Sequence, residues 1–234
     1  MRRGARTAVK ILIVLLIAAL IFDMYLLFQV RSINVVGGVS VDHAISLSGI
    51  TKNQSVFLID KEAAFERIDA DTWIKMVEVK IKYPDQVVIT AQQREIAAYV
   101  VKDDGLLAVD KECVLLEVVA KDEAALPQIF GMQMDKFEVG KQLGALDSFV
   151  LGVVQRVIAQ LNESSLDVVH IDVSLAANIV LHTKQGIEIE IGDDTQLAAK
   201  FELATITLKE LGQRGKSGGI LDVSAVTSAY YREN

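Results

Sequence analysis

Cysteine, proline and basic residues are scarce in this sequence, and each shortage argues against a class of protein. A single cysteine, Cys113, cannot form an internal disulfide, so the chain is either cytosolic or an extracytoplasmic protein that needs no such link. Cys113 lies in an apolar run, which predicts a buried structural thiol. Two prolines favour closely joined domains without a low-complexity linker. The net charge of -7 argues against nucleic-acid binding, because phosphate contacts need basic patches.

The sequence also lacks the residue patterns that carry catalysis or bind metal ions. Its three histidines, His43, His170 and His182, have no cysteine or histidine at metal-ligand spacing. No phosphate-binding loop, nucleophile elbow or zinc-protease motif is present. The Gly-Gly pairs at 37–38 and 218–219 are typical of turns. We therefore predict no catalytic residue, no cofactor and no metal site; an extracytoplasmic enzyme that depends on His170 or His182 is the alternative.

The first thirty residues combine a basic start with a long apolar run. The basic residues are Arg2, Arg3, Arg6 and Lys10. Residues 11–28 are apolar except for Asp23, and eighteen helical residues extend about 27 Å, close to the ~30 Å hydrocarbon core of a bilayer. Because basic flanks stay in the cytoplasm, we predict a cytoplasmic tail at 1–10, a transmembrane helix at 11–30 and an extracytoplasmic remainder.

Two questions about this segment stay open in the sequence. A cleaved signal peptide is the alternative to an anchor, but the residues after the apolar run are bulky where a cleavage site needs small ones. Asp23 lies near the outer end of the run, where it would reach water or a partner helix. A proton or ion role for Asp23 is the alternative.

Residues 31–98 have the pattern of a small domain with strands and two helices. Between Val77 and Ala91, apolar residues take every second position on both sides of Pro84, which predicts a β-hairpin with one buried face. Before it we expect a strand at 33–36, a helix at 41–47, an extended stretch at 55–60 and a helix at 61–68. Ser40 is the expected N-cap of the first helix, and Gly49 follows its end. The predicted order is β-α-α-β-β.

This order beside a membrane anchor resembles a POTRA domain, and the residues around the hairpin resemble the bacterial cell-division family FtsQ, called DivIB in many Gram-positive bacteria. The matching residues are Trp73, Ile74, Val77, Tyr83, Pro84, Val87, Ile89, Arg94 and Ala98. Thr72, Gln93 and Ile96 stand where the family usually has proline, glutamate and proline. Two interpretations remain for Trp73, a core anchor or a ligand platform, and two for Arg94, a solvated charge or a binding residue.

Residues 99–234 predict a mixed β-sheet domain with flanking helices, so the expected fold class of the whole chain is α+β. We expect a hairpin at 106–110 and 114–116, strands at 168–172, 178–183 and 187–191, and helices at 149–161 and 197–211. Asp194 or Thr195 is the expected cap of the second helix, with Gly212 past its end. The family resemblance continues through 126–131, Lys200, Leu203, Leu221 and Asp222.

The last predicted strand, at 223–231, is the best candidate for a binding surface. No following segment covers it, and an open strand edge accepts a strand from another protein. An ordinary edge strand with a frayed tail is the alternative. In the FtsQ family this region pairs with small coiled-coil division proteins, FtsB (DivIC) with FtsL. The resemblance therefore implies partner contacts at Val223, Ser224, Ala225, Val226, Ser228, Tyr230 and Tyr231.

The resemblance implies a non-enzymatic scaffold of the divisome, located in the inner membrane at the division septum, that links early and late division proteins. The POTRA-like domain would contact other membrane division proteins, and the apolar helix would lie in the lipid bilayer. The alternative is a POTRA-type membrane-anchored adaptor or chaperone in polypeptide transport. Tandem POTRA units or a following barrel would favour that alternative, and the sequence has neither.

Overall fold

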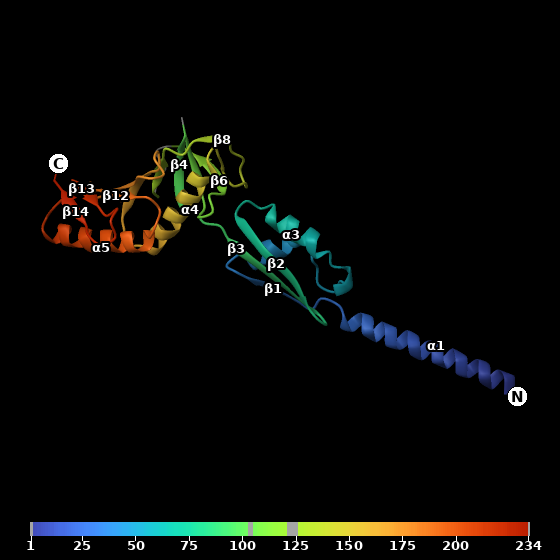
Figure 1. The fold of residues 1–234 in the computed structure, drawn as a ribbon. Coiled ribbons are helices and arrows are strands. Elements are labelled where there is room, and N and C mark those ends of the chain that lie inside the picture. The colour runs from blue at the N-terminus through green and yellow to red at the C-terminus, as the bar shows by residue number, and fades with distance from the viewer. Residues whose placement is uncertain (1, 103–104, 121–125, 234) are drawn as a thin grey trace. The chain divides into compact units, whose positions relative to one another are not determined.

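The computed structural model describes residues 2–102, 105–120 and 126–233, and it divides into two compact units between Arg94 and Glu95 (Figure 1). Both units combine helices with a β-sheet, so the α+β prediction is confirmed. The first unit begins with a long helix and contains a three-stranded sheet, whereas the second contains a nine-stranded sheet.

Helix α1 runs from Arg2 to Leu27. Its segment Lys10–Leu27 has a mean hydropathy of 2.5 and is long and apolar enough to cross a membrane. The helix also includes the basic residues that precede this segment. Large apolar side chains along the segment are exposed and form no part of either buried core.

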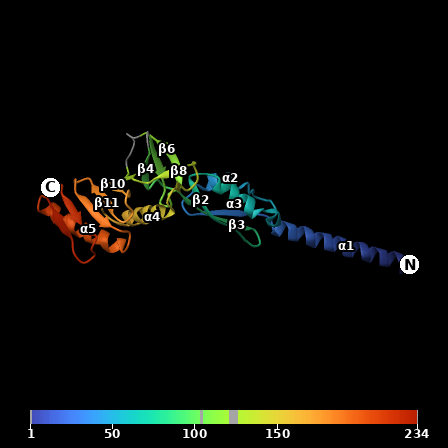
Figure 2. The ribbon, with the colours of Figure 1, turned by 45° about the horizontal axis from the view of Figure 1, so that its top comes forward.

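The rest of the first unit has the predicted β-α-α-β-β order. Its elements are β1 (Ser32–Val36), α2 (Val41–Ser48), α3 (Lys61–Asp69), β2 (Ile74–Lys82) and β3 (Gln86–Gln93). The sheet order is β1-β3-β2, with β1 parallel and β2 antiparallel to the central strand β3. The helices cover one face of this sheet (Figures 1 and 2). Ala44, Ala64 and Ile68 of the helices share a buried core with Val87 and Ile89 of β3.

One local prediction in this unit is wrong, and the structure refines two others. Residues 55–60 do not form an extended stretch, because the 3-10 turn η1 (Val56–Leu58) lies within them. Ser40 is the N-cap of α2 and Gly49 ends the helix in the left-handed conformation, both as predicted, although the Ser40 hydroxyl makes no capping hydrogen bond. Of the two interpretations of Trp73, the core anchor is excluded, because the residue is 36% exposed.

The predicted buried face of the hairpin is also wrong at two positions, Val77 and Tyr83, and Tyr83 is 63% exposed. Met76 pairs with Ala91 and Glu78 pairs with Thr90, so Val77 is the extra residue of a β-bulge. The bulge reverses the alternation, because Met76 and Val79 are buried while Val77 is 49% exposed. One inserted residue is enough to move an apolar side chain to the opposite face.

The second unit is built on a single twisted sheet. Its strands are β4 (Ala98–Lys102), β5 (Gly105–Val109), β6 (Leu115–Val119), β7 (Gln128–Phe130), β10 (Val168–Asp172), β11 (Ile179–Thr183), β12 (Glu188–Gly192), β13 (Ile220–Asp222) and β14 (Tyr230–Arg232). The strand order is β14-β13-β12-β11-β10-β7-β4-β5-β6. The short strands β8 (Met134–Lys136) and β9 (Gly144–Ala145) form a separate pair. The predicted hairpin at 106–116 and the three strands between 168 and 191 are confirmed.

Helices α4 (Ser148–Glu163) and α5 (Leu197–Gln213) pack on this sheet and share its core (Figure 2). Helix α5 begins at Leu197, as predicted, but the predicted N-cap and the predicted C-terminal end are wrong. Its N-cap is Gln196, because Thr195 donates instead to the Asp193 carboxylate in the preceding turn. Gly212 lies inside the helix, and the chain turns at Gly215, which has a φ of +69°.

Lys200 of α5 is a buried charge with defined partners. Its side chain is 2% exposed, and its Nζ donates to the Asp193 backbone oxygen at 2.9 Å and to Asp193 Oδ1 at 2.7 Å. These bonds hold the turn between β12 and α5 against the first turns of the helix. They also lower the pKa of Asp193 to about 2, with hydrogen bonds from Thr195 adding to the effect of Lys200.

Candidate partner-binding edge

The range 223–231, predicted as one strand, contains a loop followed by the start of a short strand. Strand β13 ends at Asp222, a connecting loop occupies residues 223–229, and β14 begins at Tyr230. The strands pair antiparallel, with Leu221 opposite Tyr231 and Asp222 opposite Tyr230. The prediction of one continuous strand is therefore wrong, and only Tyr230 and Tyr231 of the predicted contact residues belong to the sheet.

The connecting loop is held by its own hydrogen bonds. Val223 is fully buried, and its N–H donates to the Glu190 backbone oxygen at 3.0 Å. The Ser224 N–H and hydroxyl donate to Asp222 Oδ1 at 2.9 and 2.7 Å, which closes a turn immediately after β13. The same two bonds, with a smaller contribution from the nearby Arg232, lower the pKa of Asp222. This turn ends β13 where the sequence pattern favoured continuation.

The other predicted contact residues of the loop differ in exposure. Ala225 and Ser228 are exposed, and Val226 is half-buried. The Ser228 N–H donates to the Ala225 backbone oxygen at 3.3 Å. Val223 is therefore inaccessible to a partner, whereas the side chains of Ala225 and Ser228 are accessible in the loop before β14.

The two tyrosines of β14 have opposite environments. Tyr231 packs against the main core of the unit, and its hydroxyl donates to the Gly218 backbone oxygen at 2.9 Å. Tyr230 is 66% exposed. Alternation along the strand accounts for the difference, because neighbouring side chains point to opposite faces. Tyr231 thus anchors β14, and Tyr230 is the large side chain that β14 presents to solvent.

The two edges of the nine-stranded sheet are not equivalent. At the β6 edge, Leu115 donates to the Lys141 backbone oxygen at 2.9 Å and accepts from the Gly140 N–H at 2.8 Å, so a loop covers the start of that strand. At the other edge, β14 pairs with β13 on one side, and no strand within the described ranges pairs with its outer side. The backbone of β14 is therefore the open edge of this sheet.

Charged side chains flank the open edge. Arg232 Nη2 lies 3.4 Å from Glu190 Oε2, and Lys216 pairs with Glu233. Arg232, Lys216 and Glu233 are exposed and Glu190 is half-buried, so each ion pair contributes little to stability. Their charges lie beside the edge, where they are available to orient an incoming chain.

The motif residues of the first unit do not form one site. The Arg94 N–H donates to the Trp73 backbone oxygen at 2.8 Å, so these two residues adjoin at one end of the β2–β3 hairpin, and Arg94 is half-buried. Tyr83 and Pro84 lie in the turn at the other end. The Tyr83 ring contacts Phe28 and Phe57, two aromatic residues that the sequence pattern did not single out.

The described residues offer little for catalysis. None of them forms a group of three or more His, Cys, Asp or Glu side chains able to hold a metal ion. Cys113 is fully buried, as predicted, and burial beside Asp110 raises the pKa of its thiol to about 12. A thiol with this pKa is unreactive at neutral pH.

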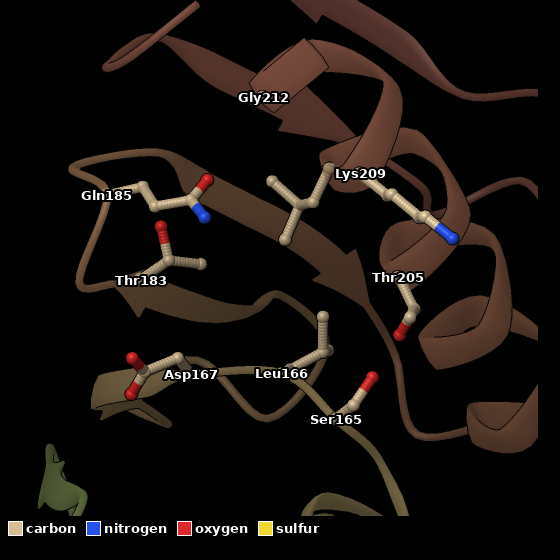
Figure 3. Close-up of a pocket in the computed structure, with 9 residues that line it drawn as sticks. Ser165, Leu166, Asp167, Thr183, Gln185, Thr205, Lys209 and Gly212 are labelled. Carbon is tan, nitrogen blue, oxygen red and sulfur yellow. The ribbon is translucent and has the colours of Figure 1, made fainter.

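A pocket of about 370 Å³ in the second unit is lined by residues of strand β11, of helix α5 and of the segments that flank β10 and β11. Asp167, Thr183 and Gln185 lie on its strand side, and Lys209 lies on α5 (Figure 3). The Thr183 hydroxyl donates to the Ile187 backbone oxygen at 2.9 Å, which secures the turn between β11 and β12. The polar groups around this pocket contain no paired nucleophile and base.

Comparison with known proteins places both units in one family. Residues 28–94 match the model of the FtsQ-type POTRA domain, and residues 98–224 match the C-terminal model of the cell division protein FtsQ/DivIB. The second match ends at Ser224, before β14 begins.

Similar whole proteins carry the same description. The chain is 24% identical to cell division protein DivIB of Clostridium botulinum over 84% of its own length and 78% of that protein. It is 24% identical to cell division protein FtsQ of Corynebacterium glutamicum over 80% of its own length and 82% of that protein. The chain is 23% identical to cell division protein DivIB of Clostridium tetani over 92% of its own length and 83% of that protein. With the FtsQ/DivIB model matching more than half of it, the chain belongs to the FtsQ/DivIB family of cell-division proteins.

Proposed function

We propose that this division protein is a non-enzymatic scaffold of the bacterial divisome. It links early and late division proteins through contacts outside the cytoplasm. The observation that carries the proposal is the open β14 edge, where a backbone able to pair lies beside the exposed Tyr230. A folded, membrane-anchored chain with such an edge is suited to holding other proteins together.

The proposed topology follows from the charges around α1. Basic residues precede the apolar segment Lys10–Leu27, and basic flanks are retained in the cytoplasm. The chain is therefore a single-pass protein of the inner membrane with a cytoplasmic N-terminus, and both folded units lie outside. Its site of action is the division septum. The residue bounds proposed for these parts are 1–10, 11–30, 31–98 and 99–234.

The proposed partners of β14 are small bitopic coiled-coil proteins of the FtsB (DivIC) and FtsL type, which add a strand to the open edge. Three residues offer only about two outward backbone hydrogen bonds, worth about 1 kcal/mol each. Micromolar affinity needs about 8 kcal/mol. The contact therefore extends beyond the backbone to Tyr230 and to the exposed loop residues Ala225 and Ser228. Other membrane division proteins contact the POTRA-like domain in this proposal.

Fluorescence imaging in the native host tests this function. A fluorophore fused before Met1 lies in the cytoplasm and leaves both folded units unaltered. The proposal predicts a band at mid-cell during division. A uniform envelope signal through the whole cell cycle would contradict it and favour an adaptor in polypeptide transport.

A further inference from the structure

Three aromatic rings from distant parts of the sequence meet at one end of the first unit. The Phe28 and Phe57 ring centroids are 5.0 Å apart, Phe57 and Tyr83 are 6.0 Å apart, and Phe28 and Tyr83 are 6.3 Å apart. These separations are typical of aromatic rings in direct contact. We call Phe28, Phe57, Tyr83 and the adjoining Leu58 the aromatic tip.

The aromatic tip exposes three large apolar side chains next to one another. Phe57 is 64%, Leu58 82% and Tyr83 63% exposed. Isolated exposed apolar residues are ordinary, but a contiguous group of large ones marks a contact surface. The exposed Phe57 and Leu58 are not needed to pack the η1 turn on the core, because the neighbouring Val56 is 1% exposed and supplies that apolar contact.

The backbone fixes the tip to the segment that leaves α1. The Val56 N–H donates to the Phe28 backbone oxygen at 2.9 Å, and the Arg31 N–H donates to the Asp85 backbone oxygen at 2.8 Å. The first bond holds the turn that carries Phe57 and Leu58. The second holds the hairpin turn that carries Tyr83. Both turns are therefore fastened within three residues of Phe28.

The place of Phe28 in the chain determines the depth of the tip. Phe28 directly follows Leu27, the last residue of α1, and its N–H still donates to the Met24 backbone oxygen at 3.2 Å. If Lys10–Leu27 spans the hydrocarbon core, Phe28 lies at its outer boundary. The Phe57 and Tyr83 rings contact Phe28, so they lie at nearly the same depth. Aromatic residues are enriched at this boundary.

The charges around the tip agree with a lipid surface. Lys52 and Lys82 are exposed close to the turns that carry Phe57 and Tyr83. Lys61, three residues after Leu58, is exposed as well, and Arg31 Nε lies 3.6 Å from Asp85 Oδ2. Apolar residues bordered by lysine are typical of segments that lie in the interface of anionic bilayers.

We propose that the aromatic tip enters the headgroup region of the outer leaflet and holds the first unit on the membrane surface. Phe57, Leu58 and Tyr83 make the lipid contact, and Phe28 connects them to the transmembrane helix. The occupant of this surface is the bilayer itself. The proposal rests on the membrane topology given under the proposed function.

A fluorescent label at Leu58 tests the proposal in the full chain. Leu58→Cys changes a side chain that is 82% exposed, so it removes no core packing, and Cys113 is buried away from a thiol reagent. The labelled protein is inserted into nanodiscs of phosphatidylcholine and phosphatidylglycerol that contain a lipid with a nitroxide near its headgroup. We expect quenching of at least about twofold, because the label would lie among the headgroups.

The matched control is Val77→Cys, which is 49% exposed on β2 of the same domain. Val77 and Tyr83 are six positions apart, a distance of about 20 Å along the hairpin. The control label should show little quenching, and a label at Phe57→Cys should behave like the label at Leu58. Equal quenching at Leu58 and Val77, or no quenching at Leu58 and Phe57, would overturn the proposal.

Imaging separates this proposal from the proposed function. A mid-cell band with no quenching at Leu58 overturns the lipid contact and leaves the scaffold function intact. Quenching at Leu58 with a uniform envelope signal overturns the scaffold function and supports the lipid contact.

Discussion

Two glycine pairs, one in each unit, make the same kind of contact with different strands. A Cβ on Gly37 would lie 2.0 Å from the Ala91 backbone oxygen, and one on Gly219 would lie 2.4 Å from the Arg232 backbone oxygen. A Cβ on the neighbouring Gly38 or Gly218 would have no atom within 4 Å, and all four glycines have positive φ. Each pair therefore holds one residue that must be glycine for space and one that is glycine for conformation alone.

The contacted strands differ in their position. Ala91 belongs to β3, which is paired on both sides at the centre of the small sheet, whereas Arg232 belongs to β14 at the edge of the large sheet. Disturbing β3 therefore breaks the core of a whole unit, and disturbing β14 frees only a terminal strand. We therefore expect that β14 can detach without unfolding the rest of its unit.

The largest expected effect is that of Gly37→Ala. The new methyl group meets the backbone of a central strand, so we expect a loss of about 4 kcal/mol or more in the free energy of unfolding. Gly38→Ala is the control, and it should cost only the roughly 1–2 kcal/mol of a left-handed conformation. Chemical denaturation of the full chain in detergent measures both. Equal losses for the two variants would show that the contact with Ala91 is unimportant.

Gly219→Ala should have a smaller and local effect. We expect about 3 kcal/mol, since only the pairing of β13 with β14 and the packing of Tyr231 are lost. Hydrogen exchange should become fast at Tyr230–Arg232 while β11 and β12 stay protected. Gly218→Ala is the control for conformation alone. Loss of protection across the whole second unit would contradict the idea of a separable edge.

Lys200→Met tests the buried charge of the second unit. Removing both hydrogen bonds to Asp193 should cost about 2 kcal/mol at pH 7. The pKa of Asp193 is about 2 in the folded chain, below its ordinary value of 3.8. The stabilisation that the Lys200–Asp193 interaction gives to the fold is therefore present above pH 4 and is lost as the pH falls from 3.8 towards 2. The stability difference between the original chain and the variant should narrow over this window. Denaturation at pH 7, 4 and 2 measures it, and a constant difference would contradict this assignment.

The smallest expected change in stability belongs to Tyr230→Ser. The side chain is 66% exposed, so the free energy of unfolding should change by no more than about 0.5 kcal/mol. Binding of the proposed FtsB-type partner should nevertheless weaken, because Tyr230 is the large exposed side chain of the open edge. Ile206→Ser on α5 is a matched control at 53% exposure. Equal binding by both variants would remove Tyr230 from the proposed interface.

The regular elements were predictable because their periodicity is strong. Alternation gave the β2–β3 hairpin and strands β10–β12, and a repeat of three to four residues gave α4 and α5. The bulge at Val77 could not be predicted, because it adds one residue without changing the composition of the strand. The end of β13 left a signal, since Ser224 two residues after Asp222 is typical of a side-chain turn.

The aromatic tip could not be predicted by reading along the chain. Phe28, Phe57 and Tyr83 are more than twenty residues apart, and only the fold brings their rings together. The η1 turn also had to replace an extended stretch before Phe57 and Leu58 could both face outward. By contrast, the sequence did place Tyr230 in the last strand. Only four of the seven residues expected to contact a partner are exposed, and Val223 is buried in the core.

Site-specific photo-crosslinking from position 230 in growing cells tests the central claim most directly. A photoreactive amino acid replaces Tyr230 in one strain and Ile206 in a control strain, and the crosslinked proteins are identified by mass spectrometry. The scaffold account predicts that position 230 captures a small single-span coiled-coil division protein and that position 206 does not. Capture of no division protein at position 230, or the same captured proteins at both positions, would contradict the account.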